Sequence, residues 1–331
     1  MREETSKRKA HHIDLAFESQ VKGTDTRFNY EPLLSEHPSD LDTTVNFLGK
    51  IMRFPLWISS MTGGTEKAGF INHNLAKAAH KYGLGMGLGS CRIILDDHTY
   101  LPDFQLRNDL GDQPFYANLG IAQLEELLEA NQSSKIKQLI EKTETDGLII
   151  HVNPMQEWLQ PEGDRFKQAP LQTIQQVRDL FEGKIIVKEV GQGMGPKSLK
   201  ALMEMDVDAI DFGAHGGTNF AMLELLRDDE EMMAQFENLT YVGHDATEMV
   251  DLCNDLMDTE SSNPMIIVSG GVSSFLDGYY YINKIKTPAV YGQASALLKR
   301  AAVSFELLDD YISREIEGYK LASSYLTIKN A

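Results

Sequence analysis

Short apolar runs recur along the chain, separated by longer stretches in which apolar residues repeat with helical spacing. Within each short run almost every position is apolar, as in parallel strands that are covered on both faces. The run Gly-Leu-Ile-Ile-His-Val at 147–152 is rich in β-branched residues and is typical of a buried strand. The pattern predicts eight strands, at residues 55–61, 84–88, 114–118, 147–152, 184–190, 209–213, 265–269 and 288–291.

The stretches between these runs predict helices. Over residues 70–82 one helical face is apolar and Gly83 follows as a stop signal; the face consists of Ile71, Leu75, Ala78 and Tyr82. Similar spacing predicts a helix ahead of Gly183 and a shorter one after the fifth strand. Eight strands alternating with helices predict an α/β protein with the (β/α)₈ TIM barrel fold.

A doubly wound sheet is the alternative fold, but the first strand is not followed by the GxGxxG turn expected there. We expect a single domain over residues 1–331, in which residues 1–50 form a short amino-terminal extension. The acidic segment 227–263 is expected to mix helix with a solvated loop.

Charge and composition narrow the function classes. A net charge of −18 argues against nucleic acid as a partner, because binding a polyanion requires a cationic surface. A small anionic substrate remains compatible, since salt screens charge beyond roughly 8 Å. No apolar run approaches the ~20 residues of a membrane-spanning helix. The chain start lacks the apolar core of a secretory signal, and two cysteines give no disulfide framework. We therefore expect a cytoplasmic protein without a membrane partner.

In a barrel, the residues that follow the strands meet at one opening. Glycine pairs follow the sixth and seventh predicted strands at 216–217 and 270–271, and Gly292 follows the eighth. A tight turn explains any single glycine, but bare N–H groups at adjacent turns bind phosphate in many barrels. The pattern predicts a phosphorylated cofactor or substrate.

Polar residues at other strand ends extend this site. Lys188 interrupts an apolar run, so it either extends its ammonium to solvent or faces an anionic ring or phosphate. Asn118 either caps a turn or serves the site, and Ser90 and Arg92 are either a helix cap and a surface arginine or contacts to an anion. The strand at 147–152 leads into a segment dense in His, Asn, Gln and Glu, where Gln156 either starts a helix or serves the chemistry.

The motifs of the chain, taken in order, resemble type 2 isopentenyl diphosphate isomerases. The resemblance runs from Arg8 to about Lys299, and the His-x-Asn-Pro-x-Gln-Glu segment is its most specific part. The glycine turns are shared by many FMN barrels. The motifs are Ser60-Met-Thr-Gly-Gly64, Gly89-Ser-Cys-Arg92, His151-Val-Asn-Pro-Met-Gln-Glu157, Gln160-Pro-Glu-Gly-Asp164, Val187-Lys-Glu-Val-Gly191 and Gly216-Gly-Thr-Asn-Phe220.

The resemblance implies an FMN- and Mg²⁺-dependent enzyme that interconverts isopentenyl and dimethylallyl diphosphate by a 1,3-allylic proton shift in isoprenoid biosynthesis. The flavin must be reduced, with NADPH as the reductant, although the reaction has no net redox change. It also implies a homo-oligomer, often a tetramer. The alternatives are another FMN-dependent barrel oxidoreductase, or a barrel that binds flavin or phosphate with impaired catalysis.

The resemblance also implies roles for individual residues. Gln156 lies beside the reacting carbons, and Glu157 coordinates Mg²⁺. The substrate is bound by Arg8, Lys9, Ser90, Arg92, His151, Asn153 and Gln156. FMN is contacted by Met61, Thr62, Ser90, Asn118, Lys188, Thr218, Gly271 and Ala294.

Several positions depart from the family pattern, among them His11 in the basic arm, where an acidic residue is usual, and His215 before the Gly-Gly-Thr turn, where small or basic residues are common. Cys91 stands where glutamine is usual, and Ser273 stands where an arginine is common. The departure at Ser273 predicts a weaker grip on the FMN phosphate. Gln156 carries no titratable proton near neutrality, so the resemblance assigns part of the proton transfer to the reduced flavin.

Overall fold

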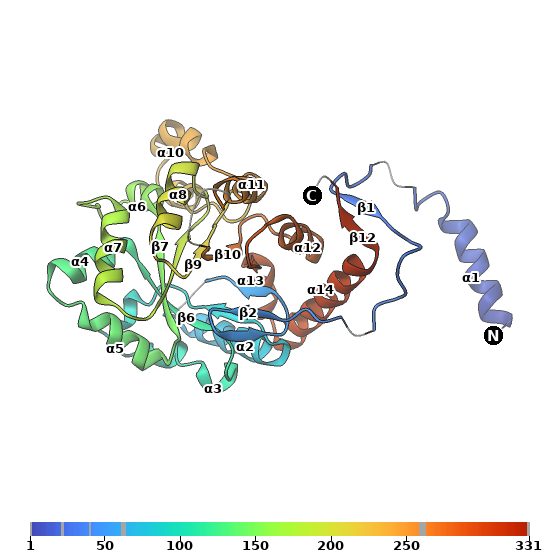
Figure 1. Ribbon diagram of the computed structural model, residues 1–331, viewed down its shortest axis with the longest axis horizontal. Helices are drawn as coiled ribbons and strands as arrows, with labels where there is room; N and C mark the ends of the chain where they lie inside the picture. The colour runs from blue at the N-terminus through green and yellow to red at the C-terminus, as the bar shows by residue number, and fades with distance from the viewer. Residues whose placement is uncertain (1, 21–22, 40, 61–63, 258–262, 330–331) are drawn as a thin grey trace.

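Eight parallel strands close into a barrel in the computed structural model, which describes residues 2–20, 23–39, 41–60, 64–257 and 263–329 (Figure 1). The predicted barrel is confirmed and the doubly wound sheet is excluded, because Tyr291 in the last strand pairs with Leu56 in the first. The strands are β4 (Leu56–Ile58), β5 (Gly85–Gly87), β6 (Phe115–Gly120), β7 (Gly147–Val152), β8 (Lys184–Glu189), β9 (Ala209–Asp211), β10 (Met265–Val268) and β11 (Ala289–Gln293).

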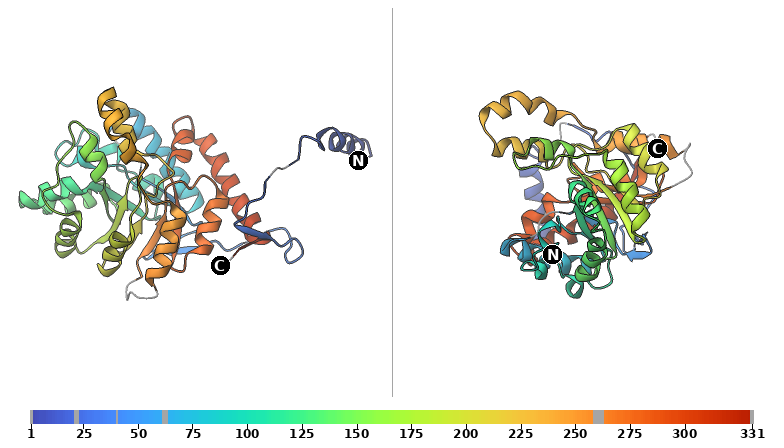
Figure 2. Two further views of the ribbon diagram at one scale, coloured as in Figure 1. Left: turned by 90° about the horizontal axis from the view of Figure 1, so that it is seen from above. Right: turned by 90° about the vertical axis from the view of Figure 1, so that its left-hand side faces the viewer.

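Helices surround the barrel and follow its strands (Figure 2). They are α2 (Glu66–Tyr82), α3 (Arg107–Leu110), α4 (Ile121–Glu129), α5 (Ser134–Thr143), α6 (Pro154–Leu159), α7 (Pro170–Leu180), α8 (Pro196–Glu204), α9 (Phe220–Arg227), α10 (Glu230–Phe236), α11 (Ala246–Met257), α12 (Phe275–Lys284), α13 (Ser295–Ala301) and α14 (Phe305–Tyr325).

Helix α2 shows how local sequence sets these elements. The Thr65 hydroxyl accepts a hydrogen bond from the Ala68 N–H at the helix start. At the other end Gly83 adopts φ 70°, a left-handed conformation that favours glycine, as the sequence predicted. The acidic segment 227–263 contains α10, the 3₁₀ helix Glu237–Tyr241 and α11, so its described part holds helix as expected.

An aromatic cluster fills the amino-terminal end of the barrel. The hairpin of β2 (Val45–Phe47) and β3 (Lys50–Met52) places the Phe47 ring against Trp57, with 4.8 Å between ring centroids. Both side chains are buried. The Lys50 ammonium pairs with Asp146, the residue directly before β7, at 2.9 Å. The hairpin therefore covers the barrel end opposite to the carboxyl ends of the strands.

The first 50 residues form several distinct pieces. Helix α1 (Arg2–Leu15) extends away from the barrel (Figures 1 and 2). Strand β1 (Phe28–Tyr30) pairs antiparallel with β12 (Leu326–Ile328), at the end of α14. The extension thus joins the carboxyl-terminal part of the chain through backbone hydrogen bonds. Within the described part of the chain, no helix has both the length and the apolar character needed to cross a membrane.

Candidate functional site

A cavity of about 640 Å³ opens at the carboxyl ends of the barrel strands. Every strand is followed by residues that line it, beginning with Ser59 after β4 and ending with Ala294 after β11. Eleven of the predicted site residues line this cavity together. They are Ser90, Arg92, Asn118, His151, Asn153, Gln156, Glu157, Lys188, Thr218, Gly271 and Ala294.

Four predicted residues are not placed in the cavity. Arg8 and Lys9 are exposed on α1, which lies apart from the barrel (Figure 1). The structure therefore does not bring these two cations to the opening. Met61 and Thr62 lie outside the described residues.

His151 lies at the end of β7 and is oriented by its neighbour on β6. The Asn118 amide donates to the Leu88 carbonyl at 3.0 Å, which turns its oxygen toward His151 Nδ1 at 2.9 Å. This arrangement favours the tautomer with the proton on Nδ1. Burial, with a smaller contribution from the Lys188 charge, lowers the pKa of His151 to about 4. The imidazole is therefore neutral at pH 7.

This pKa predicts an acid-sensitive fold. Because the His151 pKa drops from 6.5 to about 4 on folding, protons bind the unfolded chain preferentially as the pH falls through this window. The free energy of unfolding is expected to fall between pH 6.5 and pH 4, with roughly 2 kcal/mol of the loss due to this residue. Urea unfolding of wild type and His151→Gln across this range measures the contribution. If the free energy of unfolding fell with pH equally steeply in both proteins, the prediction would be wrong.

A chain of hydrogen bonds connects the polar residues that follow β7. The Asn153 amide donates to Gln156 Oε1 at 3.2 Å and to Glu157 Oε1 at 3.0 Å. Gln156 Nε2 in turn donates to Glu224 Oε1 at 3.0 Å. Gln156 and Glu157 lie in the first turn of α6, which begins at Pro154, and their side chains bond other side chains around the cavity. The helix-start interpretation and the site interpretation therefore apply to the same residues.

Glu224 is a site residue that the sequence reasoning missed. Its side chain is only 2% exposed, and its other oxygen accepts from Arg227 Nη1 at 2.7 Å. The signal available was a single carboxylate within the apolar helix that follows the Gly-Gly-Thr turn. A buried carboxylate requires partners, and here one of those partners is Gln156.

Asp164 joins the two halves of the same network. Its N–H donates to Glu157 Oε2 at 2.8 Å, while its carboxylate pairs with Arg92 Nη1 at 2.7 Å. The Asp164 carboxylate also accepts from Gln123 Nε2 at 3.1 Å. Both Glu157 oxygens are thus oriented, and Arg92 is held at the cavity with more than half of its side chain exposed.

Lys188 is buried at the end of β8, between a backbone carbonyl and the carboxylate of Asp211. Its ammonium donates to the Glu189 carbonyl at 2.7 Å and lies 3.8 Å from Asp211 Oδ2. Glu189 accepts three backbone N–H groups, from Gly191, Gln192 and Gly193. The Lys188 side chain lines the cavity instead of extending to bulk solvent, which supports the anion-facing interpretation.

Glycine turns that follow β9 and β10 line another wall of the cavity. Gly216, Gly270 and Gly271 all have positive φ, and a Cβ at Gly270 would lie 2.0 Å from the Ala214 carbonyl oxygen. Nearby, Ser59 Oγ is buried and has no protein partner among the described residues. Backbone that approaches this closely, beside an unpaired hydroxyl, fits a planar phosphorylated ligand.

Known proteins of similar sequence identify the family. The isopentenyl-diphosphate delta-isomerase of Rickettsia typhi is 33% identical over 320 residues, covering 95% of this chain and 91% of the relative. That of Rickettsia bellii is 34% identical over 326 residues, covering 95% and 92%. The chain belongs to the isopentenyl-diphosphate delta-isomerase family. The resemblance drawn from the motifs is therefore confirmed. No family model matches the chain.

Solved structures of similar fold are flavin enzymes. A mandelate oxidase variant with a monooxide FMN adduct has a TM-score of 0.59 and 11% identity, covering 91% of this chain and 87% of that chain. A flavocytochrome b2 variant with bound sulfite has a TM-score of 0.61 and 11% identity, covering 89% and 71%. At this identity the likeness extends to the barrel fold alone. The sequence relatives, not these neighbours, place the chain among the isopentenyl-diphosphate delta-isomerases.

Proposed function

We propose that this chain interconverts isopentenyl and dimethylallyl diphosphate by a 1,3-allylic proton shift, with reduced FMN and Mg²⁺ bound in the cavity. The observation that carries the proposal is the Gln156–Glu157 pair in the segment that follows β7, where Glu157 is buried and both side chains line the cavity. Relatives that share 33% identity across 95% of the chain are named for this activity. The proposal extends to isoprenoid biosynthesis in the cytoplasm, with NADPH as the flavin reductant and a homo-oligomeric, tetrameric assembly.

The residues around Glu157 fit a magnesium ion. Mg²⁺ prefers oxygen ligands and keeps several waters or phosphate oxygens. The Glu157 carboxylate lines the cavity, and Asn153 Oδ1 beside it is buried without a partner in the described part of the chain. In the proposal, Glu157 holds the ion, and the ion bridges to the diphosphate of the substrate.

The part of the cavity that contains the glycine turns fits FMN. In the proposal Lys188 and Asn118 face the flavin ring, while Gly271, Thr218 and Ala294 contact the rest of the cofactor. Met61, Thr62 and Ser90 complete the proposed cofactor contacts. Reduced FMN supplies an electron-rich ring and a proton carrier beside a substrate whose alkene is only weakly basic. The wide cavity accommodates both the flavin and a small diphosphate.

The remaining polar side chains orient the substrate. Arg92, His151 and Asn153 are proposed to contact the diphosphate, with Ser90 between substrate and flavin. A diphosphate displaces Asp164 from Arg92, or shares the guanidinium with it, because the two now form an ion pair at 2.7 Å. Arg8 and Lys9 join this set if α1 lies over the opening in the substrate complex.

Gln156 and Glu224 have complementary parts in the proton shift. The Gln156 amide has no titratable proton and serves to position the reacting carbons. Glu224 holds that amide through the 3.0 Å hydrogen bond that Nε2 donates. The flanking apolar side chains of Phe220 and Leu223 line the same part of the cavity and exclude water from it.

An anaerobic assay tests the proposal. Purified protein is incubated with FMN, Mg²⁺, NADPH and isopentenyl diphosphate, and dimethylallyl diphosphate is measured. We expect product that depends on each of the three additions. Bound, reduced flavin without product would reject the isomerase, and would favour the barrel with impaired catalysis. Consumption of NADPH in proportion to a reduced product would favour an oxidoreductase.

The environment of Cys91 argues against a reaction in which its thiol acts as the nucleophile. It is fully buried, and burial raises the pKa of its thiol to about 12. A thiol this strongly protonated is a poor nucleophile at neutral pH. The cysteine that replaces the usual glutamine of the family pattern therefore fills space beside the strand end.

A further inference from the structure

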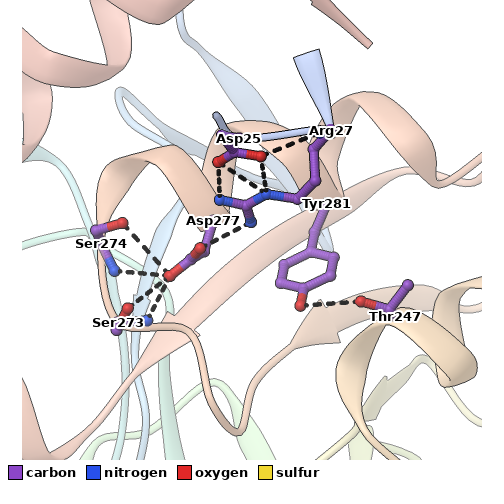
Figure 3. Close-up of polar contacts among 7 residues, drawn as sticks. All are labelled: Asp25, Arg27, Thr247, Ser273, Ser274, Asp277 and Tyr281. Carbon is purple, nitrogen blue, oxygen red and sulfur yellow. Dashed lines mark hydrogen bonds and ion pairs between the residues drawn. The ribbon is translucent and has the colours of Figure 1, made fainter. Parts of the chain in front are cut away.

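An ionic network adjoins the segment that follows the glycine turn after β10, and Figure 3 shows its members Asp25, Arg27, Ser273, Ser274 and Asp277. Asp277, in the first turn of α12, accepts the Ser273 N–H at 3.0 Å and the Ser273 hydroxyl at 2.7 Å. It also accepts the Ser274 N–H at 3.2 Å. The carboxylate therefore holds Ser273 and Ser274, which follow the glycine turn directly, and the residues from Gly270 to Ser273 line the cavity.

Arg27 reaches this carboxylate from the amino-terminal extension. Its Nη1 donates to Asp277 Oδ1 at 2.8 Å, while Nη2 and Nε bond Asp25 at 2.7 and 3.0 Å (Figure 3). The guanidinium lies 5.2 Å from the ring centroids of both Phe28 and Tyr280. Two aromatic rings and two carboxylates thus fix the guanidinium in one orientation.

The position of Arg27 is also fixed by the backbone. Its carbonyl accepts the Lys329 N–H at 2.9 Å, next to the pairing of β1 with β12. The network therefore does not depend on α1, which extends away from the barrel. Arg27 is thus distant in sequence from the residues that line the cavity, but the Asp277 side chain links it directly to Ser273, which does line the cavity.

The charge of Asp277 matters because the glycine turns near it are suited to bind an anion. Gly270 and Gly271 lie against Gly216 and Gly217, and a Cβ at Gly217 would lie 3.3 Å from the Gly271 nitrogen. Among the described residues, the N–H groups of Gly217 and Gly271 donate to no protein acceptor. These groups are available to an anion, and an uncompensated carboxylate behind them would repel it.

Asp277 is ionised at neutral pH. Burial acts to raise the pKa of its carboxyl, but hydrogen bonds from Ser273 and Arg27 outweigh burial and lower it. The hydrogen bonds that the Arg27 guanidinium donates to Asp25 and to Asp277 raise its pKa further above its usual range. The pair is therefore charged whenever a phosphorylated ligand binds.

We propose that Arg27 is a positioning residue for the phosphate group of the flavin cofactor, acting through Asp277 on the segment 270–274. The inference rests on the proposed function, because it needs a phosphorylated flavin at this wall. Arg27 offsets the carboxylate charge behind the glycine turn and holds the turn in the conformation that presents its N–H groups. It touches neither the cofactor nor the substrate.

A comparison of FMN with riboflavin tests the role, because the two ligands differ by the phosphate. Flavin fluorescence quenching gives both dissociation constants for the wild type and for Arg27→Gln. We expect Arg27→Gln to weaken FMN binding by roughly tenfold, because the Asp277 carboxylate would repel the phosphate once Arg27 no longer offsets its charge. Riboflavin binding should change by less than about twofold, since it makes no phosphate contact. Arg314→Gln is the control, because Arg314 forms an exposed pair with Asp310 on α14.

A double variant separates charge from folding. Arg27→Gln combined with Asp277→Asn removes both charges and should recover part of the lost preference for FMN over riboflavin. Equal losses for FMN and riboflavin in Arg27→Gln, or no loss for either, would overturn the inference. If Arg27→Gln does not fold, a double variant with wild-type-like preference supports it and one without preference overturns it. A wild type that binds neither flavin would instead reject the proposed function itself.

Discussion

Replacing Gln156 by alanine is expected to leave FMN affinity unchanged and to lower turnover by roughly 10²- to 10³-fold. The side chain lies between the Asn153 amide and the Glu224 carboxylate, in the cavity where the substrate carbons are proposed to bind. Alanine removes the positioning amide and keeps a strong helix former in α6. Single-turnover rates at saturating substrate, with flavin titrations alongside, measure the two effects separately.

Gln175→Ala is the matched control for this change. Gln175 is exposed on α7 and bonds Asp179 one helical turn away, far from the cavity lining. It should retain wild-type turnover. Loss of folding in Gln156→Ala alone would indicate that the residue serves mainly to start α6, as the alternative interpretation holds. Intact folding with wild-type turnover would exclude both a catalytic and a capping role.

Replacing Glu157 by glutamine is expected to raise the Mg²⁺ concentration for half-maximal activity by roughly 10- to 100-fold. The substitution removes the negative charge and turns one oxygen into an NH₂ group. That NH₂ group then faces either the Asp164 N–H or the Asn153 amide, both of which donate to the carboxylate now. Magnesium titrations of the isomerase rate at fixed substrate concentration measure the shift.

Glu141→Gln provides the control for charge alone. Glu141 is exposed on α5, where its carboxylate lies 4.0 Å from the Lys137 ammonium. Its Mg²⁺ titration should match that of the wild type. A Glu157→Gln titration that also matched the wild type would remove Glu157 from the metal site. Such a result would leave its carboxylate with the role of orienting Asn153 and Asp164.

Buried strands were predictable because parallel strands in a barrel are apolar on both faces. Each predicted run overlaps an observed strand, but the ends differ: β4 spans only Leu56–Ile58 of the predicted 55–61, and β6 and β11 each extend two residues past the predicted ends at 118 and 291. Strand ends depend on the turns that follow and on the pairing of neighbours, which single runs do not encode. The pairing of β1 with β12 joins the two ends of the chain and has no local signal at all.

The candidate site likewise contains residues that the sequence predicted and one residue that it did not. Residues next to strand ends, such as Asn118 and Lys188, reach the cavity because the barrel brings all carboxyl ends together. Glu224 was missed because it lies on a helix, where its approach to Gln156 depends on how α9 packs against α6. Arg8 and Lys9 illustrate the reverse: a motif assigned them to the site, but α1 lies apart from the barrel.

The hairpin that packs Phe47 against Trp57 determines from which end of the barrel ligands enter and leave. With one end covered by β2 and β3, ligands pass through the carboxyl-terminal opening. In the proposed reaction, substrate and product are isomers of equal charge and similar size that share this entrance. Each must leave before the other can enter, so accumulated dimethylallyl diphosphate would compete with isopentenyl diphosphate for the same entrance.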